Sequence, residues 1–200
     1  MKTPDFWYGG GASTLGALLS PFGLIYGIAT ALRQRKKAVD VGAPVVCVGN
    51  LTAGGAGKTP VVIDIARRLA NAGRQPHVIS RGYGGAVGVA PRRVDPATDR
   101  ADTVGDEPLM IAGSATVWVG GDRPGAARAA VDAGAGALVL DDGFQDPSLA
   151  KDLSIVVVDG RYGFGNGFLI PAGPLRETLR AGLARADALA VIGDDVWGVA

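Results

Sequence analysis

The amino-acid sequence predicts an α/β fold with a doubly wound, mainly parallel sheet, preceded by an apolar N-terminal helix. Two observations support the sheet: short apolar runs alternate with helical patterns, and charged or glycine-rich stretches follow directly after those runs. Such stretches gather at the carboxyl edge of a parallel sheet, where α/β proteins bind ligands. A third observation, a long uncharged stretch near the start, divides the chain. We expect residues 1–40 to form an apolar membrane-associated helix with a basic end, and residues 41–200 to form one domain.

Composition narrows the class of function. The 200 residues include 20 basic and 19 acidic side chains, a net charge of +1. A chain this close to neutral has no overall field that attracts nucleic acid, so we expect no nucleic-acid partner. The single cysteine, Cys47, lies in an apolar run and is expected to be a small core residue.

The strongest motif is a glycine-rich turn between a strand and a helix. Residues 44–48 read as a buried strand, and apolar residues recur with helical spacing from Val62 to Leu69. Backbone N–H groups of the turn would cradle phosphates, Lys58 would reach the β- and γ-phosphates, and the Thr59 hydroxyl would bind Mg²⁺. This pattern predicts a P-loop NTPase-like domain that binds ATP. The predicted nucleotide-binding residues are Thr52, Ala53, Gly54, Gly55, Ala56, Gly57, Lys58 and Thr59.

One position departs from the standard P-loop pattern. That pattern has a glycine where this chain has Thr52. A chance Gly-Lys-Thr in an ordinary loop is the alternative interpretation. The strand before the turn and the helix after it both favour the P-loop.

Further strands are predicted at residues 77–80, 116–119, 137–140, 154–158 and 188–192. The strand at 137–140 runs directly into Asp141 and Asp142, the arrangement that brings carboxylates to the Mg²⁺ of a P-loop. We therefore predict that Asp141 and Asp142 join Thr59 at the metal. A strand that simply ends in an Asp-Gly turn is the alternative.

Other candidate residues also follow strands or begin helices. Arg81 and Tyr83 lie after the strand at 77–80, Arg123 lies after the next strand, and Arg176 lies in the Pro- and Gly-rich loop 166–177.

Asp106 and Glu107 precede a helical stretch. They are candidates for a general base and its support, or they are helix-capping carboxylates. His77, the only histidine, is expected to be structural, and residues 91–103 to cross the surface.

The segment from Phe6 to Leu32 contains no charged residue, and a basic cluster from Arg33 to Lys37 follows it. A signal peptide has its charges before the apolar run, so this order argues against one. The length allows a spanning helix, but several glycines dilute the hydrophobicity and Pro21 is expected to interrupt a single straight helix. We favour a helix in the membrane interface over a spanning helix or one packed on the domain. The basic end places the domain on the cytoplasmic side.

Several of these stretches together resemble one family, tetraacyldisaccharide 4'-kinase, the lipid A 4'-kinase of Gram-negative bacteria. The resemblance covers nearly the whole chain, in the order of the family. It rests on residues 49–52 leading to Gly-Lys-Thr-Pro, and on residues 80–85, 104–108, 141–145 and 171–177.

The resemblance implies ATP-dependent, Mg²⁺-assisted phosphorylation of the 4'-hydroxyl of a tetraacyldisaccharide 1-phosphate, giving lipid IVA at the cytoplasmic face of the inner membrane. Lys58 would stabilise the transferred phosphoryl group, Asp106 would be the general base, and Glu107 would assist it. By the same match, Asp141 and Asp142 would complete the metal site. The side chains expected to contact phosphate or sugar are Arg81, Tyr83, Arg123 and Arg176.

Two departures from the family pattern affect these expectations. Asp146 stands where the family often has histidine. The family is also longer, with a smaller second domain after this point that contributes a histidine to the catalytic aspartate. Two other functions stay open: a membrane-associated ATPase of the partition class, which Ala53 disfavours because that class has lysine there, and a nucleotide-binding module without catalysis. For this chain alone, phosphate transfer and ATP binding with little turnover are both open.

Overall fold

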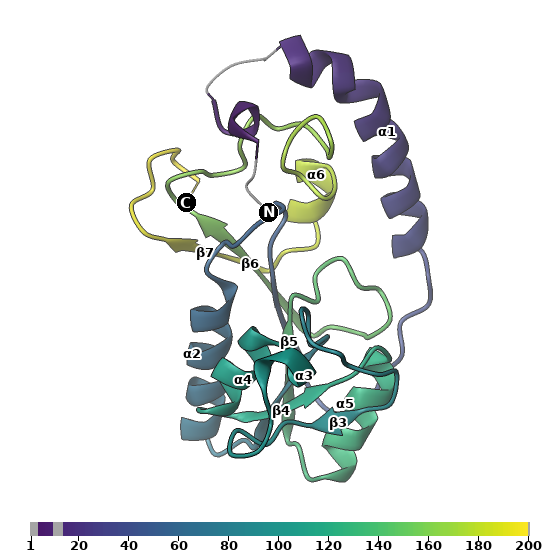
Figure 1. The fold of residues 1–200 in the computed structure, drawn as a ribbon, viewed down its shortest axis with the longest axis vertical. Coiled ribbons are helices and arrows are strands. Elements are labelled where there is room, and N and C mark those ends of the chain that lie inside the picture. The colour runs from purple at the N-terminus through teal and green to yellow at the C-terminus, as the bar shows by residue number, and fades with distance from the viewer. Residues whose placement is uncertain (1–3, 10–13, 200) are drawn as a thin grey trace.

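The computed structural model describes residues 4–9 and 14–199, arranged around one seven-stranded sheet (Figure 1). The strands lie in the order β3-β4-β2-β5-β1-β6-β7, and β3 is antiparallel to β4 while the other pairs are parallel. The strands are β1 (Val45–Gly49), β2 (Pro76–Ser80), β3 (Arg92–Arg93), β4 (Thr116–Val119), β5 (Ala137–Asp141), β6 (Leu153–Asp159) and β7 (Ala188–Ile192).

The helices cover both faces of this sheet, so the doubly wound arrangement is confirmed. One buried cluster joins α5 and the loops after β5 to one face, and a second joins α2 and α4 to the other. The helical elements are the 3₁₀ turn η1 (Asp5–Trp7), α1 (Thr14–Gln34), α2 (Lys58–Asn71), α3 (Ala101–Val104), α4 (Asp106–Ala112), α5 (Arg123–Asp132) and α6 (Leu179–Leu183).

All six predicted strands are present, because each contains a run of mainly aliphatic residues; the sheet buries most of these residues, except in the edge strand β7, which is exposed or half-buried. The central pair is in register from Val45 opposite Leu138 to Val48 opposite Asp141. This register brings the end of β1, where the glycine-rich turn begins, beside the aspartates that end β5. Strand β3 lies inside residues 91–103, where only a surface crossing was predicted, and helix α3 begins there and ends at Val104.

Two residues expected to be structural lie in the sheet. Cys47 is fully buried in β1, and burial raises the pKa of its thiol to about 11. His77 in β2 accepts a hydrogen bond at Nδ1 from Trp118 Nε1, 3.2 Å away, and its pKa is lowered by burial. A neutral imidazole fits this partner because the accepting nitrogen carries no proton.

Helix α1 is continuous through Pro21, so the expectation of an interruption was wrong. Proline removes the N–H that would bond the carbonyl of Ala17 four residues earlier. Ser20 Oγ donates to that same carbonyl at 2.8 Å and so satisfies it locally. The helix therefore passes Pro21 without leaving this acceptor unpaired.

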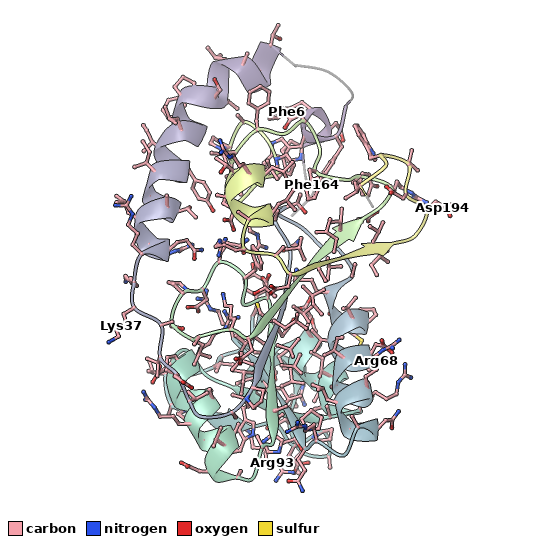
Figure 2. The ribbon with its side chains drawn as sticks, turned by 180° about the vertical axis from the view of Figure 1, so that it is seen from behind. Phe6, Lys37, Arg68, Arg93, Phe164 and Asp194 are labelled. Atoms are coloured by element: carbon pink, nitrogen blue, oxygen red, sulfur yellow. The ribbon has the colours of Figure 1, made fainter. Side chains whose placement is uncertain are left out.

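Helix α1 contacts the domain through a narrow strip and leaves most of its surface open. Gly23 and Gly27 lie against Leu169, too close for larger side chains without rearrangement, and Gln34 Nε2 donates to the Gln145 carbonyl at 3.0 Å. Figure 2 shows side chains pointing outward along this helix, with Lys37 just beyond its end. The exposed apolar side chains of α1 are Leu15, Leu18, Phe22, Leu24, Ile25, Ile28 and Leu32.

The described residues contain one helix, α1, that is long and apolar enough to cross a membrane by length and composition alone. The mean hydropathy of its 18-residue apolar stretch is 1.7, and only 17% of that stretch is buried in the molecule. A core helix of a soluble protein would bury most of such a surface. Large exposed apolar patches are typical of interaction with another protein or a membrane.

Candidate active site

A cavity of about 660 Å³ opens at the carboxyl edge of the sheet, between the glycine-rich turn, the turn after β2, residues 141–146 and the inner side of α1. It brings together side chains that lie far apart in the sequence. The predicted site residues that line it are Ala53, Gly54, Gly55, Lys58, Arg81, Tyr83, Glu107, Arg123, Asp141, Asp142 and Arg176.

The glycine-rich turn has the backbone that a phosphate-binding loop requires. Gly57, the N-cap of α2, has a φ of 74°, and Gly54 has a φ of 117°. A side chain at either position would be strained. Lys58 and Thr59, both buried, form the first turn of α2, so the helix N-terminus and the lysine face the same phosphate-sized space.

Thr52 replaces glycine because the chain pairs with another loop at that point. Thr52 forms an antiparallel bridge with Leu175, the Ala53 amide donates to the Pro174 carbonyl at 2.7 Å, and the Arg176 amide donates to the Leu51 carbonyl at 2.8 Å. Among the described residues, Asp142 is the only residue other than glycine with a positive φ, so Thr52 does not adopt the left-handed conformation that would require glycine. Its bridge to Leu175 instead gives it an extended backbone, which a β-branched residue accommodates well.

Asp141 is a buried carboxylate with one free oxygen. Its Oδ2 accepts a hydrogen bond from Ser80 Oγ at 3.0 Å, whereas Oδ1 has no partner within the described part of the chain. The pKa of Asp141 is raised to about 6, chiefly by burial and also by the nearby carboxylates of Glu107 and Asp142, which together outweigh the lowering effects of Ser80 and Lys58. A buried acceptor without a donor is the kind of atom that a bound cation satisfies.

Asp142 is charged and paired. Its Oδ1 lies 3.6 Å from Lys58 Nζ, and its Oδ2 lies 3.2 Å from Arg176 Nη1. Burial raises the pKa of Asp142, but the positive charges of Lys58 and Arg176 outweigh this and lower it. The residue adopts a φ of 50°, an arrangement that aspartate tolerates better than most residues.

The oxygens at this point fit a magnesium ion. Within the described ranges there is no group of three or more His, Cys, Asp or Glu side chains that could hold a metal. Mg²⁺ at a P-loop does not need one, because it is bound by one or two carboxylates, a hydroxyl, water and the nucleotide phosphates. The free Oδ1 of Asp141 and the hydroxyl of Thr59 belong to that donor set.

Arg123 braces the turn after β5. Its side chain is 2% exposed; Nη2 donates to the carbonyl oxygens of Asp141 (2.8 Å) and Asp142 (3.0 Å), and Nη1 donates to Asp146 (3.1 Å). Arg81, which is exposed, pairs with the same Asp146 at 2.8 Å. Arg123 thus has a structural task in addition to the phosphate contact predicted for it, and that contact stays a prediction.

Asp106 and Glu107 occupy the first turn of α4, where carboxylates are favoured by the helix dipole. Both are exposed, and neither side chain makes a hydrogen bond to another described residue. Glu107 lines the cavity, whereas Asp106 does not. Gly105 packs so closely on the Tyr83 carbonyl that any side chain would clash there, which holds α4 against the turn after β2.

Three side chains that sequence reasoning did not select connect the site to the rest of the domain. Gln145 Nε2 donates to the Asn50 carbonyl at 2.9 Å and to Glu177 Oε1 at 3.1 Å. Arg185 pairs with buried Glu177 and donates to Gln34 of α1 at 3.2 Å. Gln145 and Glu177 stand inside the quoted motifs, so position could have indicated them. Arg185 lies in a stretch without any such signal.

A smaller cavity of about 430 Å³ adjoins the other side of the glycine-rich turn. It is lined by Thr52 to Ala56, by Tyr8 from the N-terminal segment and by Tyr162 after β6. The rings of Tyr8 and Tyr162 lie 4.8 Å apart, and Tyr8 Oη lies 3.5 Å from the Ala53 carbonyl. The glycine-rich turn therefore separates two cavities and contributes to both.

Comparison with known proteins agrees with this geometry. Residues 15–197 match the family model described as tetraacyldisaccharide-1-P 4'-kinase. The chain belongs to the tetraacyldisaccharide 4'-kinase family. It is 54% identical over 204 residues to the tetraacyldisaccharide 4'-kinase of Rhodospirillum centenum, covering 100% of this chain and 60% of that protein. The enzyme of the same name from Rhodospirillum rubrum is also 54% identical, over 98% of this chain and 58% of its own length.

The fold of the family is also confirmed. The structure is similar to a crystal structure of LpxK from Aquifex aeolicus described as an "apo" form in complex with ATP, with a TM-score of 0.78 and 29% sequence identity. That match covers 92% of this chain and 61% of the other. The chain thus has the P-loop kinase fold of tetraacyldisaccharide 4'-kinases and spans about 60% of the length of the relatives it matches.

Proposed function

We propose that this chain carries the ATP- and acceptor-binding half of a tetraacyldisaccharide 4'-kinase. The reaction is transfer of the γ-phosphoryl group of ATP to the 4'-hydroxyl of a tetraacyldisaccharide 1-phosphate, which forms lipid IVA in lipid A biosynthesis. One observation carries the proposal: a single cavity joins Lys58 and the aspartates after β5 to the inner side of α1, whose outer side is apolar and exposed.

The phosphate half of the reaction is assigned to the glycine-rich turn and α2. Residues 52–59 hold the nucleotide phosphates through backbone N–H groups, and Lys58 places its charge on the transferred group. Lys58 Nζ lies 3.6 Å from Asp142 Oδ1, and a bound ATP phosphate would replace this anionic partner with another. This exchange keeps the buried ammonium neutralised throughout.

Mg²⁺ would be held by Thr59, Asp141 and Asp142, and when bound it neutralises charge on the phosphates. Asp141 fits this task because its Oδ1 is buried without a partner. Arg123 fixes the backbone that presents both aspartates, and Arg176 holds the Asp142 side chain. Most of the catalytic gain in phosphoryl transfer comes from such positioning and charge neutralisation.

On the acceptor side, Asp106 is proposed as the general base that takes the proton of the sugar hydroxyl, with Glu107 in support. Glu107 lines the cavity, and Asp106 precedes it in the exposed first turn of α4, where both carboxylates are accessible to solvent and would be accessible to a bound sugar. Arg81, Tyr83, Arg123 and Arg176 are proposed contacts to phosphate or sugar. The smaller second domain of the family is proposed to complete the site.

We also propose a location: peripheral or monotopic attachment at the cytoplasmic face of the bacterial inner membrane. Residues 1–40 would form the membrane-associated part and residues 41–200 the kinase domain. The exposed apolar arc of α1 would lie among acyl chains, and its basic end would lie on anionic headgroups. An acylated acceptor could then enter the cavity from the membrane surface along α1.

The test is transfer of label from γ-labelled ATP to tetraacyldisaccharide 1-phosphate in detergent micelles. The parent chain is compared with Asp106→Ala, and with Asp132→Ala as a matched control on the distant helix α5. Labelled lipid from the parent and the control, and a loss of at least about 100-fold for Asp106→Ala, would support the proposal and the base assignment. ATP hydrolysis that ignores the lipid would instead favour a membrane-associated ATPase. Tight ATP binding without transfer, even with the family's second domain supplied in trans, would favour a non-catalytic module.

A further inference from the structure

The cavity contains five cationic side chains, and four of them are already paired with acids. Lys58 and Arg176 pair with Asp142, and Arg81 and Arg123 pair with Asp146. These four belong to the α/β domain and surround the P-loop end of the cavity. Asp141 and Glu107 line the cavity as well, so four acidic side chains accompany these four cations.

The fifth cation, Arg33, differs in origin and in pairing. It lies in the last turn of α1 and lines the cavity, yet no acidic side chain among the described residues forms an ion pair with it. Tyr26, seven residues earlier, lines the cavity too. Seven residues are about two helical turns, so Tyr26 and Arg33 stand on one side of α1, next to the strip that contacts Leu169.

This arrangement places an unpaired cation away from the P-loop. Helix α2, which carries Lys58, and helix α1, which carries Arg33, lie on opposite sides of the molecule (Figure 1). The cavity between them therefore has a phosphoryl-donor end with balanced charge and a second end with an excess positive charge. A neutral sugar alone would not neutralise that charge.

The acceptor named for the family has an anion at a fixed distance from its reacting hydroxyl. It is a disaccharide 1-phosphate that is phosphorylated at the 4'-position, so the anion and the reacting oxygen lie on different sugars. An acceptor with its 4'-hydroxyl beside Lys58 has its 1-phosphate directed away from the P-loop. Arg33 is the cavity cation that this phosphate could meet without breaking an existing ion pair.

We propose that Arg33 binds the 1-phosphate of the acceptor and so selects the orientation in which the 4'-hydroxyl faces the P-loop. This inference rests on the proposed function and adds a specificity residue to it. A guanidinium suits the task because it forms two parallel charge-assisted hydrogen bonds to a phosphate. Tyr26 on the same side of α1 would lie beside the sugar or the first carbons of an acyl chain.

The phosphates of the bilayer are the competing source of the same chemistry. The cluster after α1 supplies Arg35, Lys36 and Lys37, which are exposed and do not line the cavity. These three are suited to headgroups at the membrane surface. Arg35→Gln is therefore a matched control for Arg33→Gln, because each variant removes one charge from the same end of the helix.

The experiment measures binding of two probes to the 200-residue chain in neutral detergent micelles. The probes are tetraacyldisaccharide 1-phosphate and the same lipid without its 1-phosphate, and the readout is intrinsic tryptophan fluorescence. We expect the parent and Arg35→Gln to bind the phosphorylated probe about 10- to 100-fold more tightly. We expect Arg33→Gln to reduce this preference to less than about 2-fold, and Arg33→Lys to retain part of it.

Several outcomes would overturn the inference. If Arg33→Gln kept the parent's preference for the phosphorylated probe, Arg33 would have no role in binding the 1-phosphate, and the kinase proposal would stay intact. Equal binding of both probes by the parent would lead to the same conclusion. A variant that loses affinity for phosphatidylglycerol vesicles but keeps its probe preference would assign Arg33 to the bilayer. Binding of neither probe above the micelle background would reject the proposed acceptor itself, and this inference with it.

Discussion

The Nζ atom of Lys58 lies 3.6 Å from Oδ1 of Asp142, which is also held by Arg176. The lysine that follows the glycine-rich turn is thus matched with an aspartate from the turn after β5. The pair joins the first turn of α2 to the turn after β5 at the carboxyl edge of the sheet. It also keeps a lysine that is only 9% exposed from being a lone buried charge.

Replacing Lys58 by methionine keeps the length and apolar packing of the side chain but removes its charge. Because charge-assisted hydrogen bonds are worth about 1.5–3 kcal/mol, we expect ATP affinity to fall by about 10- to 100-fold in titration calorimetry. Lys36→Met, in the exposed segment after α1, is the control and should bind ATP as the parent does. Equal affinities for Lys58→Met and the parent would argue against a phosphate-binding role for the loop.

Asp141 should make stability depend on pH. Because burial raises its folded-state pKa from 3.8 to about 6, the folded protein holds a proton that the unfolded chain has already lost between these values. The free energy of unfolding should therefore fall as pH rises through this range, by about 3 kcal/mol in total, and stay lower above it. Asp141→Asn should remove this contribution, so its stability advantage over the parent should grow from pH 4 to pH 8 in urea unfolding.

Asp142→Asn is the matched control for that experiment, because the pKa of Asp142 is lowered in the folded state. Its carboxylate stabilises the fold at neutral pH, and this contribution is lost as pH falls through the folded-state pKa. The Asp142→Asn variant should therefore be less stable than the parent at pH 8, whereas Asp141→Asn should be more stable.

We also expect Mg²⁺ to stabilise the parent at pH 8 and to have little effect on Asp141→Asn. Stabilisation of both proteins by Mg²⁺ to the same extent would contradict a metal at this carboxylate.

Arg123→Ala should destabilise the domain by about 3–5 kcal/mol, because it leaves the carbonyl oxygens of Asp141 and Asp142 without their donor in a buried place. Lysine cannot bond both carbonyls and Asp146 together, so Arg123→Lys should recover only part of the loss. Arg128→Ala, on the exposed side of the same helix, should change the stability by less than about 0.5 kcal/mol. Chemical unfolding of the three variants would measure these differences, and similar values for Arg123→Ala and Arg128→Ala would refute the bracing role.

Charges on the outer side of α1 should release the protein from membranes. Ile25 is 66% exposed, so Ile25→Glu should leave the fold intact while it opposes burial among acyl chains and repels anionic headgroups. We expect at least about a 10-fold lower partition into phosphatidylglycerol vesicles by co-sedimentation. Val196→Glu, which changes a similarly exposed residue far along the chain, should partition like the parent. If both variants partitioned alike, α1 would not be the membrane-binding surface.

The strands and the phosphate loop were predictable because they depend on local patterns. Runs such as Val45–Gly49 and Ala137–Asp141 are apolar without interruption, and this pattern alone predicts buried parallel strands. Adjacent strand ends then bring Lys58 and Asp142 together without further information.

What the sequence did not reveal depends on partners that are distant along the chain. Nothing near Thr52 indicates that it pairs with Leu175, and nothing near Arg185 indicates that it meets Glu177 and Gln34. Pro21 was misread because the hydroxyl of the preceding serine satisfies the carbonyl that proline leaves unpaired. The shared cavity of α1 and the P-loop is likewise a property of the folded chain.

The loop at residues 166–177 contacts two parts of the chain that are far apart in function, the apolar helix α1 and the glycine-rich turn. At Leu169 it receives the glycines of α1, and at Pro174 to Arg176 it pairs with the start of the glycine-rich turn. Anyone who trims the N-terminal helix to obtain a more soluble protein will therefore also remove a support of the nucleotide-binding backbone. A better route to solubility is to exchange the outward-facing side chains of α1 while keeping Gly23, Gly27 and Gln34 as they are.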